Sequence, residues 1–486
     1  MAHAGDWAGT KIDASPPADQ APRTPLGATR TPSDEPIAPP EPESPPRERL
    51  SSSELARLIV RGGAWSLFIS TIGAVLSLAV HLVLARVLGG EEYGRYVFAL
   101  AWMNVLLLFG KFELDTASVR FVGAYSGTEQ WSFLRGFLRR SSQIVGGVSL
   151  AIAVVGALVI LALTDRIERG IALSLLAASA LLPVTAMAQL KASAMQGFKQ
   201  VARAQAPSLV IRPVIFVVVL LGLHYVGRVA VSAPVAILLQ VGATTVALIL
   251  TIRFLQGVVP SAVRQAAEAF DTRYWMKTAA GLLVISSGQT ILSTNADVLV
   301  VGSLLGPGAA GKYGAASQLA SAVGFGVTAI SFIALPIIAD LYARQAFSQL
   351  QALISHVTRL GLLLSAPVLL GLVFGAAPLL SAFGPSFTDA SGLLILLGFD
   401  QLIGAIFGVS GYLLVMTGHQ VTAARVIIGC AVLNLVLTFV LTPIMGLMGA
   451  GIATTIATLA RSYLLTSQVR TALGLSLSPW AKRPND

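Results

Sequence analysis

Two aspartates interrupt long apolar runs of this sequence, and their carboxyl groups could hold a cation or a proton. Asp297 lies in the segment STNADVLVV, and Asp400 lies beside Gln401 in LLGFDQLIG. A charged carboxylate in hydrocarbon costs about 3 kcal/mol or more unless a proton, a cation or a basic side chain neutralises it. We therefore predict that Asp297 and Asp400 are ion-coupling residues. The structural alternatives are that Asp297 caps a broken helix or pairs with Lys312, and that Asp400 makes an internal hydrogen bond.

Membrane helices are the elements that must position these aspartates. The 486-residue chain is 55% hydrophobic and 12% charged, with a mean hydropathy of +0.77, whereas soluble domains carry about 25% charged residues. Its apolar runs have about the 20 residues that a helix needs to cross the bilayer, and none alternates like a barrel strand. We predict an all-α integral membrane protein with about twelve spans, at 62–84, 94–114, 142–163, 171–190, 208–223, 229–250, 278–304, 314–338, 358–377, 391–415, 421–441 and 447–465.

The first 50 residues differ from the rest in composition. They are rich in Pro, Ala, Ser and acidic residues, as in APPEPESPP, and contain no apolar run. Such a segment cannot bury enough surface to offset its ordering entropy, and it lacks the apolar core of a signal peptide. The predicted organisation is a disordered cytoplasmic tail (1–50), an N-terminal six-helix lobe (51–257), a cytoplasmic linker (258–277), a C-terminal six-helix lobe (278–470) and a cytoplasmic tail (471–486).

The basic residues predict the orientation in the membrane. With the N-terminus in the cytoplasm, about 24 of the 33 Lys and Arg residues flank spans on the cytoplasmic side and about 6 on the other. Both termini are therefore predicted to be cytoplasmic, and topology accounts for the net charge of +10. A nucleic-acid partner is excluded because no basic soluble domain is present. The single Cys430 excludes an intrachain disulfide and a thiolate metal site.

One segment between spans predicts a helix on the inner membrane surface. In EQWSFLRGFLRR, residues 129–140, apolar and basic residues alternate with helical spacing. We expect Trp131, Phe133, Leu134 and Phe137 to lie in the interface, with the arginines toward lipid phosphates.

The sequence contains an internal repeat of about 220 residues. Three motif pairs carry it: Tyr93-Gly94 with Tyr313-Gly314, AMQGFKQVARAQ around Gly197 with VMTGHQVTAARV around Gly418, and Tyr125 with Tyr342. Each copy holds six predicted spans, an even number, so the two copies are expected to be parallel repeats with a substrate cavity between them.

The repeat relates a histidine to one of the aspartates. Aligning Gly89 with Gly306 places His81 within one residue of the position equivalent to Asp297. The two halves then offer titratable groups at similar depth, one cationic when protonated and one acidic. We predict that they face a common cavity.

The segment LVLARVLGGEEYGRYVFALAWMNVLLLFGKFELDTASVRFVGAY resembles the first helix pair of the bacterial polysaccharide transporter family. AMQGFKQVARAQ, TNADVLVVGSLLGPGAAGKYGAASQLA and LLSAFGPSFTDASGLLILLG extend the resemblance over nearly all of the chain from Arg57 onward. This family contains the O-antigen and other lipid-linked oligosaccharide flippases of the multidrug/oligosaccharidyl-lipid/polysaccharide exporter superfamily.

The resemblance implies a two-lobed exporter fold in the bacterial inner membrane. It further implies alternating access that moves an undecaprenyl-diphosphate-linked oligosaccharide to the periplasmic leaflet, for lipopolysaccharide, O-antigen or exopolysaccharide synthesis. Glycan assembly proteins are the expected partners.

A diphosphate ligand requires basic groups, and guanidinium groups bind phosphate oxygens in pairs. The predicted substrate-binding residues are Arg86, Arg120 in ASVRFV, Arg212 in VIRPVIF, Arg461 in ATLARSYLL, and His81. For Arg120 and Arg212 the alternative is an anchor at the cytoplasmic interface, and for Arg461 it is snorkelling from the end of the last span.

Three other functions compete with a flippase. A multidrug exporter of the same superfamily would differ in cavity chemistry alone. A membrane-embedded glycan polymerase or ligase would need a His and carboxylate cluster on a sizeable loop, and the loops here lack one. A purely structural membrane protein would not need ionisable residues within the spans of both halves. We therefore predict a transporter without catalytic residues, metal or cofactor, coupled to a Na⁺ or H⁺ gradient.

Overall fold

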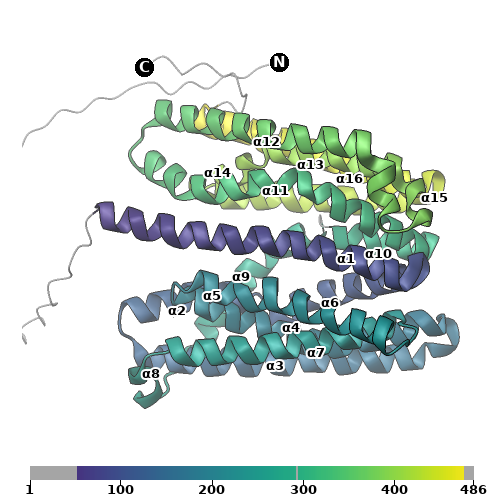
Figure 1. Cartoon of the computed structure of the whole chain (residues 1–486). Helices are drawn as coiled ribbons and strands as arrows, with labels where there is room; N and C mark the ends of the chain where they lie inside the picture. The colour runs from purple at the N-terminus through teal and green to yellow at the C-terminus, as the bar shows by residue number, and fades with distance from the viewer. Residues whose placement is uncertain (1–51, 292–293, 476–486) are drawn as a thin grey trace, which may run out of the picture. The chain divides into compact units, whose positions relative to one another are not determined.

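The computed structural model describes residues 52–291 and 294–475, which contain helices and no strand (Figure 1). The predicted tail 1–50 and most of the tail 471–486 lie outside these residues. The N-terminal half consists of α1 (Ser52–Lys111), α2 (Leu114–Gly127), α3 (Trp131–Ala162), η1 (Thr164–Arg166), α4 (Arg169–Gly197), α5 (Val201–Ala206), η2 (Pro207–Ile211), α6 (Arg212–Leu221), η3 (Gly222–Val226) and α7 (Ala233–Val258).

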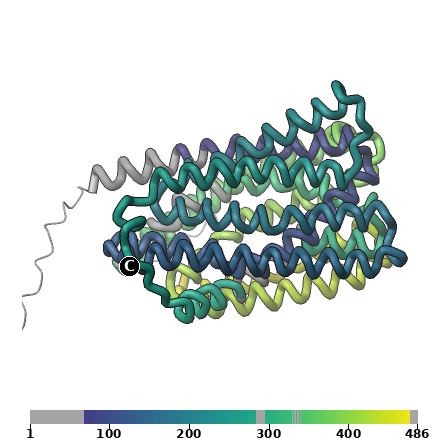
Figure 2. Tube along the Cα trace, turned by 90° about the horizontal axis from the view of Figure 1, so that it is seen from below, coloured from purple at the N-terminus to yellow at the C-terminus, as the bar shows by residue number. Residues whose placement is uncertain are grey.

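After the short helix α8 (Ser261–Gln265), the C-terminal half runs to the end of the described chain, as the Cα trace shows (Figure 2). It consists of α9 (Thr272–Ile291), α10 (Thr294–Leu305), α11 (Pro307–Ala343), α12 (Phe347–Ser381), η4 (Pro385–Ala390), α13 (Ser391–Phe407), α14 (Val409–Met416), α15 (Gln420–Met445) and α16 (Leu447–Leu473). The elements η1 and η4 are 3₁₀ helices, and η2 and η3 are π-helices.

The prediction of an all-α integral membrane protein is confirmed. Among the described residues, eight helical segments are long and apolar enough to cross a bilayer. One of them, Phe68–Lys111, contains two predicted spans, because α1 continues through a sharp break at Gly89. The predicted spans 278–304, 314–338 and 447–465 correspond to α9 with α10, to α11 and to α16.

The internal repeat is present in the backbone. Left-handed residues occur at matching points of the two halves, 216 to 219 residues apart: Gly89 and Gly306, Glu129 and Gln345, Lys199 and Gly418, and Arg228 and Gly446. Gly89 (φ 77°, ψ 171°) and Gly306 (φ 90°, ψ 172°) have nearly the same conformation, which side chains with a Cβ rarely adopt. The same backbone turn therefore separates the two parts of α1 in one half and α10 from α11 in the other.

Each half packs around its own set of helices. In the N-terminal half α4 contacts α2, α3 and α7, and in the C-terminal half α13 contacts α11, α12 and α16 (Figure 1). The helix α9 links them, because it contacts both α2 and α15. Its Trp275 is buried, and the indole Nε1–H donates a hydrogen bond of 2.9 Å to the Tyr125 hydroxyl.

The predicted helix at residues 129–140 is present from Trp131 on, but the prediction that Leu134 and Phe137 lie in the membrane interface is wrong. From Trp131 on, this segment is the first part of α3, and Leu134 and Phe137 are fully buried in the protein. Arg139 forms an ion pair of 2.7 Å with Glu268, and Arg135 donates hydrogen bonds to two carbonyl groups of the linker after α7. The linker covers this face of α3 and binds Arg135 and Arg139.

Candidate functional site

Asp297 lies at the centre of a buried hydrogen-bonded cluster. Its Oδ2 accepts hydrogen bonds from the hydroxyl groups of Tyr313 (2.9 Å) and Thr454 (3.0 Å). Its Oδ1 accepts one from Asn434 Nδ2 (3.0 Å). These four residues, here called the Asp297 cluster, come from α10, α11, α15 and α16, so the cluster joins four helices of the C-terminal half.

The two structural alternatives for Asp297 have different outcomes. Lys312 forms its ion pair with Asp389, at 2.9 Å, so it is not the partner of Asp297. Asp297 does lie in the first turn of α10, where the helix dipole favours a negative charge. This position does not exclude an ion-binding role. The helix dipole does not occupy the carboxylate oxygens, and both of them accept hydrogen bonds from polar side chains of other helices.

The Asp297 cluster has the donor set of a site for a small cation. It combines a carboxylate, an amide and two hydroxyl groups, and hard cations prefer such oxygen ligands. The buried Asn434 Oδ1 accepts no hydrogen bond. Turning the Asn434 amide over would bring this oxygen to Asp297, where a cation could bridge the two groups. The residues present therefore fit a coupling ion.

Asp400 lies near the Asp297 cluster on α13. It is 6% exposed, its Oδ1 has no hydrogen-bond partner, and the Thr458 side chain hydrogen-bonds its carboxylate. The charges of Asp297 and of Arg461 both act on it. Thr454, Thr458 and Arg461 follow the helical spacing of α16 and share one face. One helix face thus contacts both aspartates and carries Arg461.

His81 has a related but simpler environment. Its Nδ1 lies 2.9 Å from the hydroxyl oxygen of the buried Tyr93. Tyr93 is the repeat mate of Tyr313, so each half bonds the same tyrosine to an ionisable residue at an equivalent depth. The sequence relation between His81 and Asp297 therefore has a structural counterpart, although each residue is bonded within its own half.

A small polar cavity lies in the N-terminal half. It has a volume of about 170 Å³ and is called the N-half cavity; its polar lining residues are Ser77, His81, Tyr96, Ser208, Arg212 and Gln240. The Tyr96 hydroxyl hydrogen-bonds Gln240. Arg212 follows the π-helix η2, which begins at Pro207, a residue without an N–H to donate. The wider π turn shifts the helix register just before Arg212.

A larger cavity lies in the C-terminal half. It has a volume of about 710 Å³ and is called the C-half cavity; its polar lining residues are Gln401, Ser410, Tyr412, Gln420, Arg461 and Ser462. Arg461 is the repeat mate of Gln240 in the N-half cavity. Each of these two cavities is thus lined by one guanidinium group, Arg212 in the N-half cavity and Arg461 in the C-half cavity.

Arg86 and Arg120 line neither cavity. Arg86 Nε and Nη2 donate hydrogen bonds to the carbonyl oxygens of Ala382 (2.5 Å) and Ser381 (2.9 Å) at the C-terminal end of α12. Arg86 therefore joins the two halves. Beside it, the backbone of Gly94 approaches Pro307 so closely that a Cβ atom would lie 1.9 Å from the Pro307 oxygen. Arg120 is exposed on α2.

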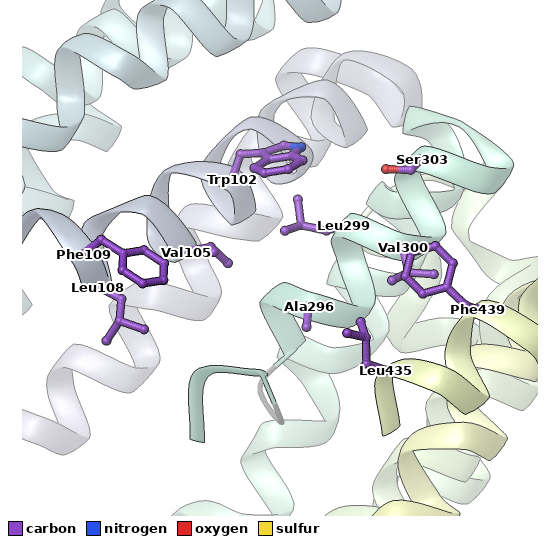
Figure 3. Close-up of a pocket in the computed structure, with 10 residues that line it drawn as sticks. All are labelled: Trp102, Val105, Leu108, Phe109, Ala296, Leu299, Val300, Ser303, Leu435 and Phe439. Carbon is purple, nitrogen blue, oxygen red and sulfur yellow. The ribbon is translucent and has the colours of Figure 1, made fainter. Parts of the chain in front are cut away.

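An apolar cleft of about 340 Å³ lies between the halves, and its lining side chains are drawn in Figure 3. They are Trp102, Val105, Leu108 and Phe109 of α1, Ala296, Leu299, Val300 and Ser303 of α10, and Leu435 and Phe439 of α15. Asn104 of α1 donates a hydrogen bond of 3.1 Å to Asn295 of α10 close by. The cleft thus adjoins the backbone that carries Asp297.

The sequence does not reveal the residues that surround Asp297. It indicates Tyr313 as a repeat anchor and not as a ligand. Asn434 and Thr454 carry no local signal, because single amides and hydroxyls occur throughout apolar spans. The aromatic residues of the cleft, such as Trp102, cannot be told in a sequence from residues that face lipid.

Known proteins resemble this chain in sequence. The model of the family described as "Polysaccharide biosynthesis protein" matches residues 59–342, more than half of the chain. A curated relative, "Probable low-salt glycan biosynthesis flippase Agl15" of Haloferax volcanii, is 26% identical over 189 residues. That alignment covers 38% of this chain and 40% of the relative, so it spans less than half of the relative's length.

Solved structures resemble this chain in fold. An inward-facing multidrug resistance MATE family transporter of the MOP superfamily has a TM-score of 0.67 at 12% identity, over 85% of this chain and 98% of that one. Lipid II flippase MurJ in an inward closed conformation has a TM-score of 0.64 at 14% identity, over 83% and 87%. These likenesses show a shared two-lobed helical fold. With the family match over more than half of its length, this chain belongs to the polysaccharide biosynthesis protein family.

Proposed function

We propose that this protein is a flippase that moves an undecaprenyl-diphosphate-linked oligosaccharide from the cytoplasmic to the periplasmic leaflet of a bacterial inner membrane. The observation that carries the proposal is the combination of two cavities with polar side chains in their walls, each with one guanidinium group, and an apolar cleft between the halves. A lipid-linked glycan is amphiphilic and needs both kinds of site. The family match and the flippase relative support the same function.

The N-half cavity is suited to the diphosphate. Arg212 offers paired N–H donors for phosphate oxygens, and His81 and Ser77 add further polar contacts. The helix α1 lines both this cavity, through Leu100, and the apolar cleft, through Trp102. Residues two positions apart point to roughly opposite sides of a helix, so the two sites flank α1. With the diphosphate in the cavity, the hydrocarbon chain would reach the apolar surface across α1, where its burial is favourable.

Alternating access follows from the contact between the halves. With both termini cytoplasmic, as the basic residues predict, the turns at Gly89 and Gly306 face the periplasm. The hydrogen bonds of Arg86 and the close approach of Gly94 then close the periplasmic side. Rocking one half against the other would break these contacts and open the cavities to the periplasm.

Ion coupling is assigned to the Asp297 cluster. A buried carboxylate beside the unpartnered Asn434 Oδ1 is stabilised when Na⁺ or H⁺ neutralises it. The cluster joins four helices, so its occupancy changes how tightly α10 is held against α11, α15 and α16. An ion can shift the balance between two conformations only by binding them with different affinity.

A multidrug exporter is the second candidate. The cleft carries Trp102, Phe109 and Phe439 close to the segment with Asp297, and aromatic rings with a carboxylate suit an organic cation. A transport assay with both substrate types separates the two functions.

The test is flipping in proteoliposomes that contain a fluorescent undecaprenyl-diphosphate-linked oligosaccharide. The wild type should move it between leaflets, and Arg212→Gln should slow movement about tenfold or more, because a charged hydrogen bond to phosphate is lost. Arg120→Gln is the matched control, since Arg120 lines no cavity, and it should flip at the wild-type rate. Export of an organic cation dye without flipping of the lipid would contradict the flippase proposal.

A further inference from the structure

We infer that the C-half cavity is the subsite for the oligosaccharide of the substrate. The inference rests on the flippase proposal and divides the substrate between the halves: the diphosphate in the N-half cavity, the hydrocarbon chain in the apolar cleft and the sugars in the C-half cavity. Two observations support it, namely the lining of the C-half cavity and its size.

The lining of the C-half cavity suits sugar hydroxyl groups, which both donate and accept hydrogen bonds. Gln401 and Gln420 offer amides, and Ser410 and Ser462 offer hydroxyls. The Tyr412 side chain is 42% exposed and offers an aromatic face for a sugar ring. A few polar groups set in a mostly apolar wall are typical of a binding site for a small molecule.

Arg461 supplies donors that the protein itself does not use. In the part of the chain that the structure describes, its guanidinium group forms no hydrogen bond and no ion pair within 4 Å. A guanidinium has five N–H donors and no acceptor, so a ligand rich in oxygen atoms would satisfy it.

The C-half cavity is larger than the N-half cavity, as expected if the first holds the sugars and the second holds the diphosphate. Ligand pockets usually have volumes of about 300 to 1,000 Å³. The C-half cavity, at about 710 Å³, has room for more than one sugar, whereas the N-half cavity, at about 170 Å³, fits a compact group such as a diphosphate.

The test compares the reactivity of one cysteine in each cavity, in a Cys430→Ser background. Ala424→Cys reports on the C-half cavity and Ser77→Cys on the N-half cavity. The purified full chain is labelled with a maleimide in the presence of undecaprenyl diphosphate, or of lipid-linked oligosaccharides extracted from the producing cells. At ten times the dissociation constant, a blocked site should react about tenfold more slowly.

We expect both lipids to protect Ser77→Cys, and the lipid-linked oligosaccharide alone to protect Ala424→Cys. The inference is overturned if neither lipid protects Ala424→Cys while Ser77→Cys is protected, a result that leaves the flippase proposal intact. Equal protection of Ala424→Cys by undecaprenyl diphosphate would also overturn it, because the cavity would then hold the diphosphate. If neither lipid protects either cysteine, the flippase proposal itself fails and the inference with it.

Arg461→Gln gives an independent readout, because glutamine is the residue that the N-terminal half has at the equivalent position. This change should weaken binding of the lipid-linked oligosaccharide about tenfold and leave binding of undecaprenyl diphosphate unchanged. Arg425→Gln, at an exposed arginine of α15 outside the cavity lining, should change neither. Equal loss of both lipids in Arg461→Gln would contradict the inference.

Discussion

The N-terminal and C-terminal halves share their backbone turns, but they attach different chemistry to them. In the N-terminal half, the Tyr93 hydroxyl oxygen lies 2.9 Å from His81 Nδ1. In the C-terminal half, the equivalent Tyr313 is one of three donors to Asp297, the others being Asn434 and Thr454. The repeat thus supplies equivalent positions, and the substitutions between its copies place the candidate ion site in one copy.

The N-half and C-half cavities also differ, in volume and in the residues at equivalent positions of the repeat. Gln240 and Arg461 are repeat mates, yet the cavity around Gln240 has about a quarter of the volume of the cavity around Arg461. Arg212 supplies the guanidinium of the smaller cavity from a different helix. A duplicated fold therefore need not have duplicated sites, and each half is expected to bind a different part of one ligand.

Because the halves differ in their ionisable groups, we expect the largest loss of transport on substitution of Asp297. Asp297→Asn should abolish transport driven by an ion gradient, because the neutral amide takes up no proton and brings no negative charge for Na⁺ to neutralise. His81→Gln, at the equivalent position, should retain most of it. Gradient-driven flipping in proteoliposomes is the measurement. Equal loss in both variants would show that the halves do not differ in ion coupling.

Tyr93 and Tyr313 test whether the two halves differ in ion binding. Tyr313→Phe removes one of the three hydrogen bonds to Asp297 and should change the apparent ion affinity about tenfold, since hydrogen bonds to charged groups contribute about 1.5–3 kcal/mol. Tyr93→Phe should leave ion affinity unchanged. The ion concentration that gives half-maximal flipping measures both. A larger shift for Tyr93→Phe than for Tyr313→Phe would reverse the assignment.

The repeat glycines predict an unequal effect on stability. A Cβ atom at Gly94 would meet the backbone oxygen of Pro307 at 1.9 Å, whereas one at Gly314 would meet the Val97 side chain at 2.8 Å. Backbone atoms can move aside less easily than a side chain. Gly94→Ala should therefore lower the free energy of unfolding by about 1–3 kcal/mol, and Gly314→Ala should lower it by less. Thermal unfolding in detergent compares them, and an equal or greater loss for Gly314→Ala would contradict the prediction.

The smallest predicted effect concerns Arg86. Arg86→Gln removes two hydrogen bonds between the halves at an exposed site, worth about 1 kcal/mol or roughly fivefold in the closed population. Gly90→Cys with Ser386→Cys reports that population in a Cys430→Ser background, because a Cβ at Gly90 would lie 3.0 Å from Ser386 Oγ.

Disulfide formation between these two cysteines should slow in Arg86→Gln and stay unchanged in Arg120→Gln, which does not join the halves. An unchanged rate in both would mean that Arg86 does not hold the periplasmic side closed.

The fold could be predicted from the sequence because its causes are local or periodic. Long apolar runs predict the spans, and the conformation at Gly89 and Gly306 explains why their spacing reveals the repeat. The environment of residues 129–140 could not be predicted, because the linker that covers Leu134 and Phe137 lies more than 120 residues away in the sequence. An amphipathic pattern indicates an apolar face without indicating what covers it.

The candidate site could be predicted only in part, for the same reason. A charged carboxylate in an apolar run costs free energy wherever it lies, so Asp297 and Asp400 can be recognised in the sequence as candidates. The partners of Asp297 could not be found, because Asn434 and Thr454 lie 137 and 157 residues away. Arg86 could be recognised as a functional candidate, but its hydrogen bonds to α12 depend on how the halves meet.

We propose that this protein couples flipping of a lipid-linked oligosaccharide to ion entry at Asp297. Ion uptake by proteoliposomes that contain the wild-type protein, with and without the lipid-linked oligosaccharide, can be measured for Na⁺ and for H⁺. We expect the lipid to stimulate uptake of one of these ions, flipping to rise with the same gradient, and Asp297→Asn to abolish both effects. Flipping at one rate with and without either gradient, and without ion uptake, would contradict the proposal.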